Sequence, residues 1–187
     1  MKSNNPTMVY FGGMRKYKRP LEVLYLLKNL LGKFDNLKLF IVGNGPEEKN
    51  MKRLSYNLNV QNNVEFMGRL SSNELSVIVA SSWLNIHTSI TEGWGFSILE
   101  ASAAGTPTIA YDVPGVRDAV EDGQNGIKVE DANREALTEA AYKILINPEN
   151  WFSSSIKVAK KYSWDKTAEL WEYLSNELND VRSKHQI

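Results

Sequence analysis

Residues 84–110 read LNIHTSITEGWGFSILEASAAGTPTIA, and this stretch decides the fold. An apolar run at Leu84–His87 is followed by a glycine-containing loop, by a helical pattern that begins at Phe96, and by a second apolar run at Thr108–Ala110. Short β-rich runs on either side of an amphipathic segment are typical of a strand, a helix and a second strand. The stretch therefore predicts one βαβ unit with two parallel strands.

The same alternation continues along most of the chain. The other β-rich runs are Met8–Phe11, Leu37–Val42, Val64–Met67 and Ile127–Val129. Between the first two of these runs, four leucines recur at helical spacing: Leu21, Leu24, Leu27 and Leu31. Ser71-Ser72-Asn73-Glu74 is a capping box, which we expect to begin a helix that runs through Ala80. Six strands separated by helices predict the α/β class, with one doubly wound, mainly parallel sheet.

The C-terminal quarter of the chain is expected to add further helices. They are predicted over residues 132–146, up to about residue 160 after a break at Asn147-Pro148, and from Trp164 onward. The last helix carries an apolar stripe: Trp164, Ala168, Trp171, Leu174, Leu178 and Val181. We expect this stripe either to fold back on the sheet of its own chain or to contact another chain. No linker divides the chain, and we describe it as a sheet-bearing domain, residues 1–163, with an additional C-terminal helix, residues 164–187.

Composition excludes several classes of protein. The 187 residues carry 22 Lys plus Arg and 22 Asp plus Glu, so the overall charge predicts neither a nucleic acid nor an anionic membrane as partner. There is no cysteine and there are two histidines, too few for a thiolate or histidine-based metal site. No apolar run approaches the ~20 residues of a membrane span, and no signal-peptide pattern begins the chain. We therefore expect a soluble, cytoplasmic protein.

Residues 91–101, TEGWGFSILEA, combine two carboxylates with the expected start of a helix. Gly93 and Gly95 allow the backbone to turn tightly and to approach a ligand, while the free N–H groups and the dipole of the helix attract phosphate. Glu92 lies on the loop, and Glu100 lies about one turn inside the helix. The arrangement outlines a sugar-nucleotide site. The alternative is a charged loop before a surface helix.

Helical spacing separates two faces in this stretch. Phe96, Leu99 and Ala103 form one face, which we expect to pack on the sheet. Ser97, Glu100 and Ala104 lie on the neighbouring face, which we expect to line a cleft. A glutamate on a closely packed helix is costly unless a partner donates hydrogen bonds to it, and ribose hydroxyls are suitable donors.

Two further loops are expected beside this one, because ligands of open α/β sheets bind at the carboxyl ends of the strands. The segment Gly12–Pro20 contains four cations that could clamp a diphosphate, although it could equally be a solvated basic turn. The segment Val42–Pro46 reads as a structural strand-to-helix turn. His87 is interpreted as a hydrogen-bonded packing residue rather than a base. Trp94 is expected either to form a wall of the cleft or to anchor its loop.

Together these motifs resemble, in order, the sequence blocks of retaining GT-B glycosyltransferases of family 4. The resemblance covers nearly the whole chain and centres on the E-x7-E region of that family. The matching segments are Gly12–Pro20, Ile41–Pro46, Val64–Leu70, Glu92–Phe96, Glu100-Ala101, Ala104–Pro107, Asp112–Asp118, Glu121–Gly126 and Tyr162–Asp165.

The resemblance implies that this chain is one Rossmann-like half of a GT-B fold, the C-terminal half that binds a nucleotide-diphospho-sugar donor. It implies transfer of a sugar to an acceptor hydroxyl with retained anomeric configuration, in glycan or glycolipid synthesis, and it implies no cofactor and no metal. The acceptor-binding N-terminal domain would be missing from the chain, which is then expected to be a fragment or an excised domain. Any membrane association would occur through that missing half.

The resemblance also assigns roles to individual residues. Glu100 would accept hydrogen bonds from the ribose, Glu92 would lie near the transferred sugar, and Lys18 would neutralise the leaving diphosphate. Main-chain groups of Arg69 and Leu70 would border the base. The other expected donor-binding residues are Gly12, Gly13, Gly43, Gly93, Trp94, Gly95, Phe96 and Ser97.

One residue departs from the pattern of the family. Gly13 occupies the position of an arginine that usually precedes the lysine in the first phosphate loop, and Arg15, two residues further on, is the candidate replacement. Glu92, Lys18 and Arg15 are therefore the expected catalytic residues. Two other functions stay open at this point, a sugar-nucleotide epimerase and a non-catalytic nucleotide-binding module.

Overall fold

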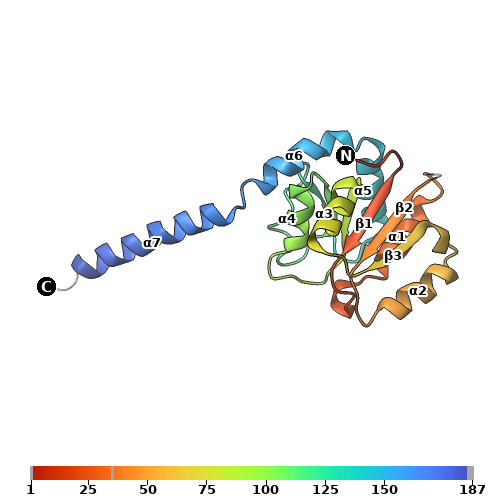
Figure 1. The fold of residues 1–187 in the computed structure, drawn as a ribbon, viewed down its shortest axis with the longest axis horizontal. Coiled ribbons are helices and arrows are strands. Elements are labelled where there is room, and N and C mark those ends of the chain that lie inside the picture. Colours follow the sequence, from red (N-terminus) through yellow and green to blue (C-terminus); the bar gives the residue numbers. More distant parts are fainter. Residues whose placement is uncertain (1, 35, 185–187) are drawn as a thin grey trace.

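The computed structural model describes residues 2–34 and 36–184, with side chains up to residue 177. Its centre is a six-stranded parallel sheet in the order β3-β2-β1-β4-β5-β6. Figure 1 labels β1, β2 and β3. The strands are β1 (Thr7–Phe11), β2 (Lys38–Val42), β3 (Val64–Gly68), β4 (Leu84–His87), β5 (Thr108–Tyr111) and β6 (Gly126–Val129). All six predicted strands are confirmed to within one residue at each end. The order reverses between β1 and β4, so the sheet is doubly wound.

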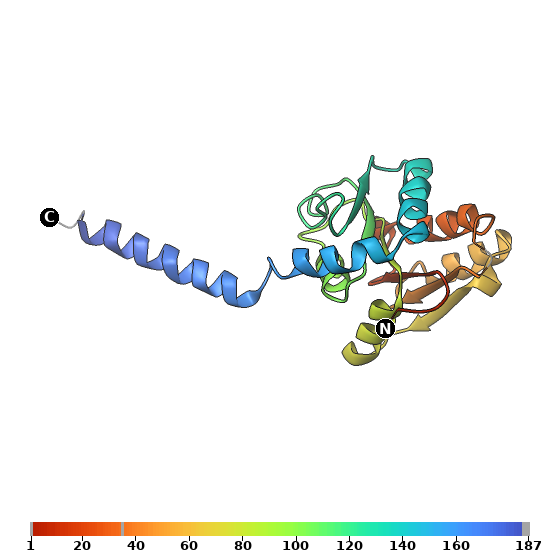
Figure 2. The same ribbon diagram turned by 90° about the horizontal axis from the view of Figure 1, so that it is seen from above.

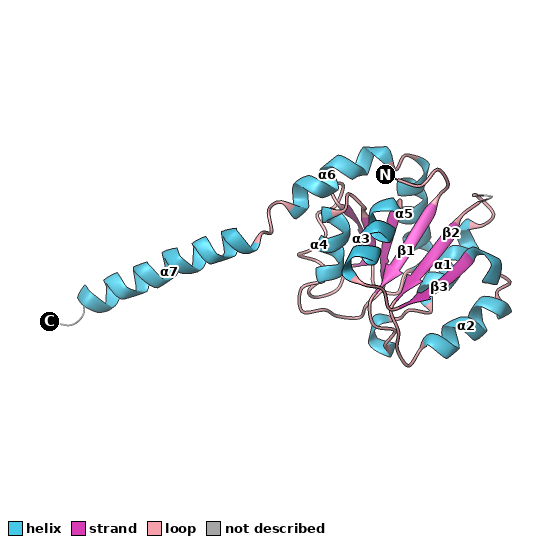
Figure 3. Cartoon of the chain, in the orientation of Figure 1, coloured by secondary structure: helices cyan, strands magenta, loops and turns pink. Residues whose placement is uncertain are grey.

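Helices cover both faces of the sheet (Figure 3). They are α1 (Glu22–Leu30), α2 (Glu48–Asn57), α3 (Ser72–Ser81), α4 (Phe96–Ala103), α5 (Arg134–Ile146), α6 (Glu149–Ala159) and α7 (Trp164–Lys184), with short 3₁₀ turns η1 (Lys16–Lys18) and η2 (Gln61–Asn63).

The residues of β1 show how the two faces are filled. Met8 and Tyr10 belong to the core shared with α1 and α5, whereas Val9 and Phe11 belong to a second cluster with α3 and α4. Successive side chains of a strand point to opposite faces, so a continuous apolar run such as this one is buried on both sides. The predicted capping box is also present at the start of α3, where Ser71 and Glu74 bond to each other's main-chain N–H groups.

The prediction that Phe96, Leu99 and Ala103 pack on the sheet is wrong. Ala104, expected on the cleft side, instead packs against the second cluster. The buried face of α4 is formed by Ile98, Ala101 and Ser102, and Phe96 is 60% exposed. The buried face includes a serine, which periodicity alone counts as polar. Its hydroxyl donates to the Ile98 carbonyl and accepts from Asn125 Nδ2, so its burial leaves no unpaired group.

The helix α7 extends away from the sheet in both views (Figures 1 and 2). Trp164 and Trp171 are 79% and 69% exposed. The possibility that the apolar stripe folds back on its own sheet is therefore wrong for its described residues, and a contact with another chain stays a prediction. The side chains of Leu178 and Val181 lie outside the described residues. No helix in the described part of the chain is long and apolar enough to cross a membrane.

Candidate functional site

A cavity of about 590 Å³ lies at the carboxyl ends of β1, β2 and β4, beside the point where the strand order reverses. All the residues expected from the sequence to bind the donor line this one cavity, and so do Lys18 and Glu92. Phe11, Val42, Asn44 and Leu75 also line it and were not predicted. Arg15 is the one expected site residue that is not part of the lining. The predicted convergence of three loops is therefore present in the fold.

An ion pair stands in this cavity. Lys18 Nζ lies 2.7 Å from Glu92 Oε1, and the Ser89 hydroxyl donates to the same oxygen at 2.7 Å. His87 Nε2 lies 3.5 Å from it. The contact from His87, together with Lys18 and Ser89, outweighs the effect of burial and lowers the pKa of Glu92 to about 2. The side chain is therefore a carboxylate throughout the neutral pH range.

The loop that carries Glu92 is held by a close backbone approach at Gly115. This residue has a φ of +78°, and a Cβ atom built on it would lie 2.0 Å from the Glu92 carbonyl oxygen. In turn, the Glu92 N–H donates to the Pro114 carbonyl at 3.1 Å. Glycine is required where the backbone needs both a left-handed conformation and such a short approach. The segment 112–118 thus supports the Glu92 loop from behind.

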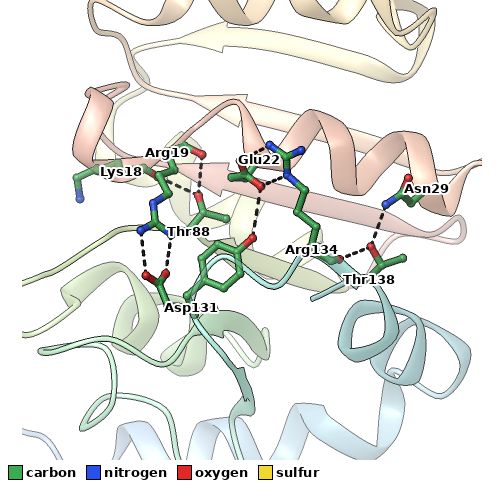
Figure 4. Close-up of polar contacts among 9 residues, drawn as sticks. Lys18, Arg19, Glu22, Asn29, Thr88, Asp131, Arg134 and Thr138 are labelled. Atoms are coloured by element: carbon green, nitrogen blue, oxygen red, sulfur yellow. Dashed lines mark hydrogen bonds and ion pairs between the residues drawn. The ribbon is translucent and has the colours of Figure 1, made fainter. Parts of the chain in front are cut away.

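The basic loop that carries Lys18 is fixed to the rest of the sheet on both sides (Figure 4). Thr88 donates its hydroxyl to the Lys18 and Arg19 carbonyls at 2.9 and 3.1 Å. Arg19 has a φ of 45°, and its guanidinium forms a two-pronged ion pair with Asp131. Lys18 and Arg19 are thereby tied to the neighbouring loops, whereas Arg15, Lys16 and Tyr17 are exposed, so the first part of the segment is a solvated turn.

Arg15 runs along Gly13 outside the cavity. Its Cγ and Nε atoms each lie 3.8 Å from the position that a Cβ on Gly13 would occupy. The side chain of Arg15 thus passes close to the position where the family arginine would begin. It does not line the cavity.

The loop after β2 lies against the basic loop, and its glycines allow the close approach. A Cβ on Gly43 would lie 2.1 Å from the Gly12 carbonyl oxygen, and one on Gly45 would lie 2.5 Å from that of Met14. The Met14 N–H donates to the Asn44 carbonyl at 2.9 Å. Together these contacts place main-chain atoms of both loops at the edge of the cavity.

The N-terminus of α4 opens into the cavity. Gly95 precedes it with a φ of 74°, and within the described residues no side chain caps the helix. The first N–H groups of such a helix lack partners in their own helix, so those of Phe96 and Ser97 can bind an anion. One turn further on, Glu100 lines the same cavity. The expected close packing around this residue is wrong, because Glu100 is exposed, although neighbouring atoms desolvate its carboxyl group enough to raise its pKa.

Trp94 has both of the roles that were considered for it. It lines the cavity, and its ring packs against Tyr162 at 5.7 Å between centroids, close to edge-on. The loop of α4 is thereby attached to the segment between α6 and α7.

Sequence comparison identifies the family. The family described as Glycosyl transferases group 1 matches residues 1–162, and the chain therefore belongs to it. An uncharacterized glycosyltransferase of Haemophilus influenzae is 32% identical over 91% of this chain and 49% of its own length. The poly(glycerol-phosphate) alpha-glucosyltransferase of Bacillus subtilis is 31% identical over 80% of this chain and 22% of its own length. The chain spans about half or less of these relatives.

Solved structures share the fold. TarM superposes with a TM-score of 0.84 at 22% identity, over 93% of this chain and 36% of that one. Anabaena Alr3699/HepE in complex with UDP and glucose gives 0.81 at 22% identity, over 92% and 49%. The pneumococcal O-GlcNAc transferase GtfA in complex with UDP and GlcNAc gives 0.82 at 21% identity, over 91% and 35%. The chain thus has the fold of one Rossmann-like half of a GT-B glycosyltransferase.

Proposed function

We propose that this chain is the donor-binding domain of a retaining, metal-independent glycosyltransferase of family 4, which transfers a sugar from a nucleotide-diphospho-sugar to an acceptor hydroxyl. The observation that carries the proposal is the shared cavity at the strand ends. It combines the open N-terminus of α4, the Lys18–Glu92 pair and Glu100. The helix N-terminus and Lys18 suit a diphosphate, Glu92 suits a sugar, and Glu100 suits a ribose.

The negative charge that develops on a leaving nucleoside diphosphate needs preorganised donors. The amides of Phe96 and Ser97 supply part of them. Lys18 supplies the other part, because an ammonium group has three donors and only one is used by Glu92, so the lysine can bridge the carboxylate and a phosphate oxygen. Glu92 stays ionised beside the sugar, where it can accept a hydrogen bond from a sugar hydroxyl or stabilise positive charge on the sugar ring.

We expect no metal, because the positive charge of Lys18 can neutralise the leaving diphosphate in place of a metal ion. In the described part of the chain no group of three or more His, Asp or Glu side chains is placed to hold a metal ion. UDP is the first nucleotide to test, because UDP is the nucleotide in the GtfA and Alr3699/HepE complexes. Because the chain spans about half or less of its relatives, we expect the acceptor to be bound by a second domain.

A second candidate is a non-catalytic nucleotide-binding module. It is favoured by Gly13 at the position of the family arginine and by the placement of Arg15 outside the cavity. An epimerase is disfavoured, because such an enzyme needs acid or base groups on both sides of the sugar, whereas Glu92 is the main group of this kind near the expected sugar position.

Calorimetric titration with UDP, GDP and ADP, with and without Mg²⁺, tests the proposal. One nucleotide is expected to bind equally well in both conditions. Glu100→Ala should weaken binding at least tenfold, or about 1.5 kcal/mol, through loss of hydrogen bonds to a charged acceptor. Glu139→Ala on the exposed side of α5 removes the same charge elsewhere and should change nothing. Equal affinities of the two variants would contradict the assignment of Glu100.

A further inference from the structure

Three consecutive residues at the end of β4 have buried polar side chains. His87, Thr88 and Ser89 are 5%, 1% and 2% exposed. Buried polar groups are costly without hydrogen bonds, and the position after a strand end could equally hold apolar residues. Their partners therefore indicate why polar side chains stand here.

All three side chains contact the ion pair of the cavity or the backbone that carries it. Ser89 Oγ and His87 Nε2 lie 2.7 and 3.5 Å from Glu92 Oε1. Thr88 lies between them in sequence and donates to the main-chain carbonyl of Lys18 (Figure 4). One tripeptide thus holds the acidic side chain of the pair and the main chain of the basic residue.

The hydrogen bonding of His87 is not that of a satisfied packing residue. Nε2 faces the Glu92 carboxylate at 3.5 Å. Nδ1, on the other side of the ring, is buried without a hydrogen-bond partner among the described residues. An unpaired buried polar atom destabilises the fold. The contact with Glu92 is the compensating interaction on this side chain.

Lys18 Nζ and Ser89 Oγ donate to Oε1 of Glu92, and His87 Nε2 contacts the same oxygen. Oε2 of Glu92 receives no hydrogen bond from any residue that the structure describes. Glu92 lines the cavity, so its second oxygen is the one left for a ligand.

We propose that His87-Thr88-Ser89 is a positioning element that fixes the Lys18–Glu92 pair and leaves Oε2 of Glu92 for the donor. This rests on the proposed function of the cavity. When Lys18 bonds a phosphate, Ser89 and His87 hold the Glu92 carboxylate in place. Thr88 holds the main chain of Lys18 in place through its hydrogen bond to the Lys18 carbonyl.

The test pairs each loss of a donor with a variant that keeps it. His87→Leu removes the ring nitrogen that contacts Glu92, whereas His87→Gln places an amide nitrogen near the same point. Ser89→Ala and Ser89→Thr form the second pair, and Thr88→Val and Thr88→Ser the third. The first readout is the pKa of Glu92, measured by carboxyl ¹³C NMR of the full chain labelled at glutamate, with the Glu92 signal assigned by means of Glu92→Gln. The second readout is the affinity for UDP and for UDP-glucose.

His87→Leu and Ser89→Ala should each raise the pKa of Glu92 by roughly one unit, because Ser89→Ala removes a hydrogen bond to the charged form and His87→Leu removes the polar ring contact with it. His87→Gln and Ser89→Thr should keep it low. Lys18 and Tyr10 also face Glu92 and are unchanged in all variants, so they do not contribute to the difference. An unchanged pKa in both donor-removing variants overturns the proposal. If His87→Leu does not fold, Ser89→Ala decides.

Binding separates this proposal from the proposed function. His87→Leu and Ser89→Ala should weaken UDP-glucose at least threefold and leave UDP unchanged, because Glu92 lies near the expected sugar. Thr88→Val should weaken both ligands, and Thr88→Ser should weaken neither. Equal loss of both ligands in Ser89→Ala would contradict a role in holding Glu92. If the unaltered chain binds neither ligand, the proposed function fails, while the NMR titration still decides whether the tripeptide holds Glu92.

Discussion

Replacement of Gly115 by alanine should damage both the fold and the donor site. The new Cβ would lie 2.0 Å from the Glu92 carbonyl oxygen, and relief of that overlap must move one of the two loops by more than 1 Å. The left-handed backbone of an alanine costs ~1–2 kcal/mol. The hydrogen bond from the Glu92 N–H to the Pro114 carbonyl would be lost as well, at about 1 kcal/mol. We therefore expect Gly115→Ala to lose about 3 kcal/mol of unfolding free energy.

Gly123→Ala is the matched control. Gly123 has nearly the same φ, +75°, but no described atom lies within 4 Å of its Cβ position. Gly123→Ala should lose only the cost of the left-handed backbone, ~1–2 kcal/mol of unfolding free energy. Gly93→Ala has an ordinary φ and open space, so it should be nearly neutral.

Urea unfolding followed by circular dichroism measures these differences, with thermal midpoints lowered by about 2–4 °C per kcal/mol for a chain of this size. UDP-glucose binding should be weakened in Gly115→Ala and unchanged in Gly123→Ala. Equal destabilisation of these two variants would refute the close approach of the segment 112–118 to the Glu92 loop.

Three more perturbations have expected outcomes. Gly13→Arg should fold normally, because its Cβ meets only the flexible Arg15 side chain at 3.8 Å. The added guanidinium should strengthen UDP binding about tenfold. No gain in affinity in a titration would contradict the assignment of this position to the phosphates. The pKa of Glu92 is lowered in the folded protein, so its contribution to stability is present above about pH 4.5 and is lost as the pH falls toward 2. Glu92→Gln should therefore lose less stability than the unaltered chain between pH 6 and pH 3, as measured by urea unfolding. An equal loss in both proteins would argue against the lowered pKa. Removal of residues 164–187 should change the thermal midpoint by no more than about 2 °C, since the α7 side chains described are largely exposed, and a larger drop would show that α7 packs on the domain in solution.

The strands and the location of the site could be predicted from the sequence because both depend on local patterns. The β-rich runs are bounded by turn residues, and the loops that follow parallel strands meet where the strand order reverses. Gly12, Gly43 and Glu92 could therefore be placed in one cavity before their distances were known.

The parts that could not be predicted depend on contacts between distant residues. The buried face of α4 includes Ser102 because Asn125, 23 residues away, donates to it. Ser89 lies three residues before Glu92 on an irregular loop, where spacing does not say which side chains meet. The exposure of the α7 stripe has no local signal, because the same apolar pattern suits a helix that packs on its own chain and one that contacts a partner.

The central claim is that the cavity at the carboxyl ends of β1, β2 and β4 binds a nucleoside diphosphate. Amide NMR of the ¹⁵N-labelled chain during titration with UDP tests this claim most directly. The account predicts saturable shifts centred on the N–H groups of Gly12, Gly43, Phe96 and Ser97, with distant amides such as those of α5 unchanged. Saturable shifts centred elsewhere, or no shifts with UDP, GDP or ADP at millimolar concentration, would contradict it.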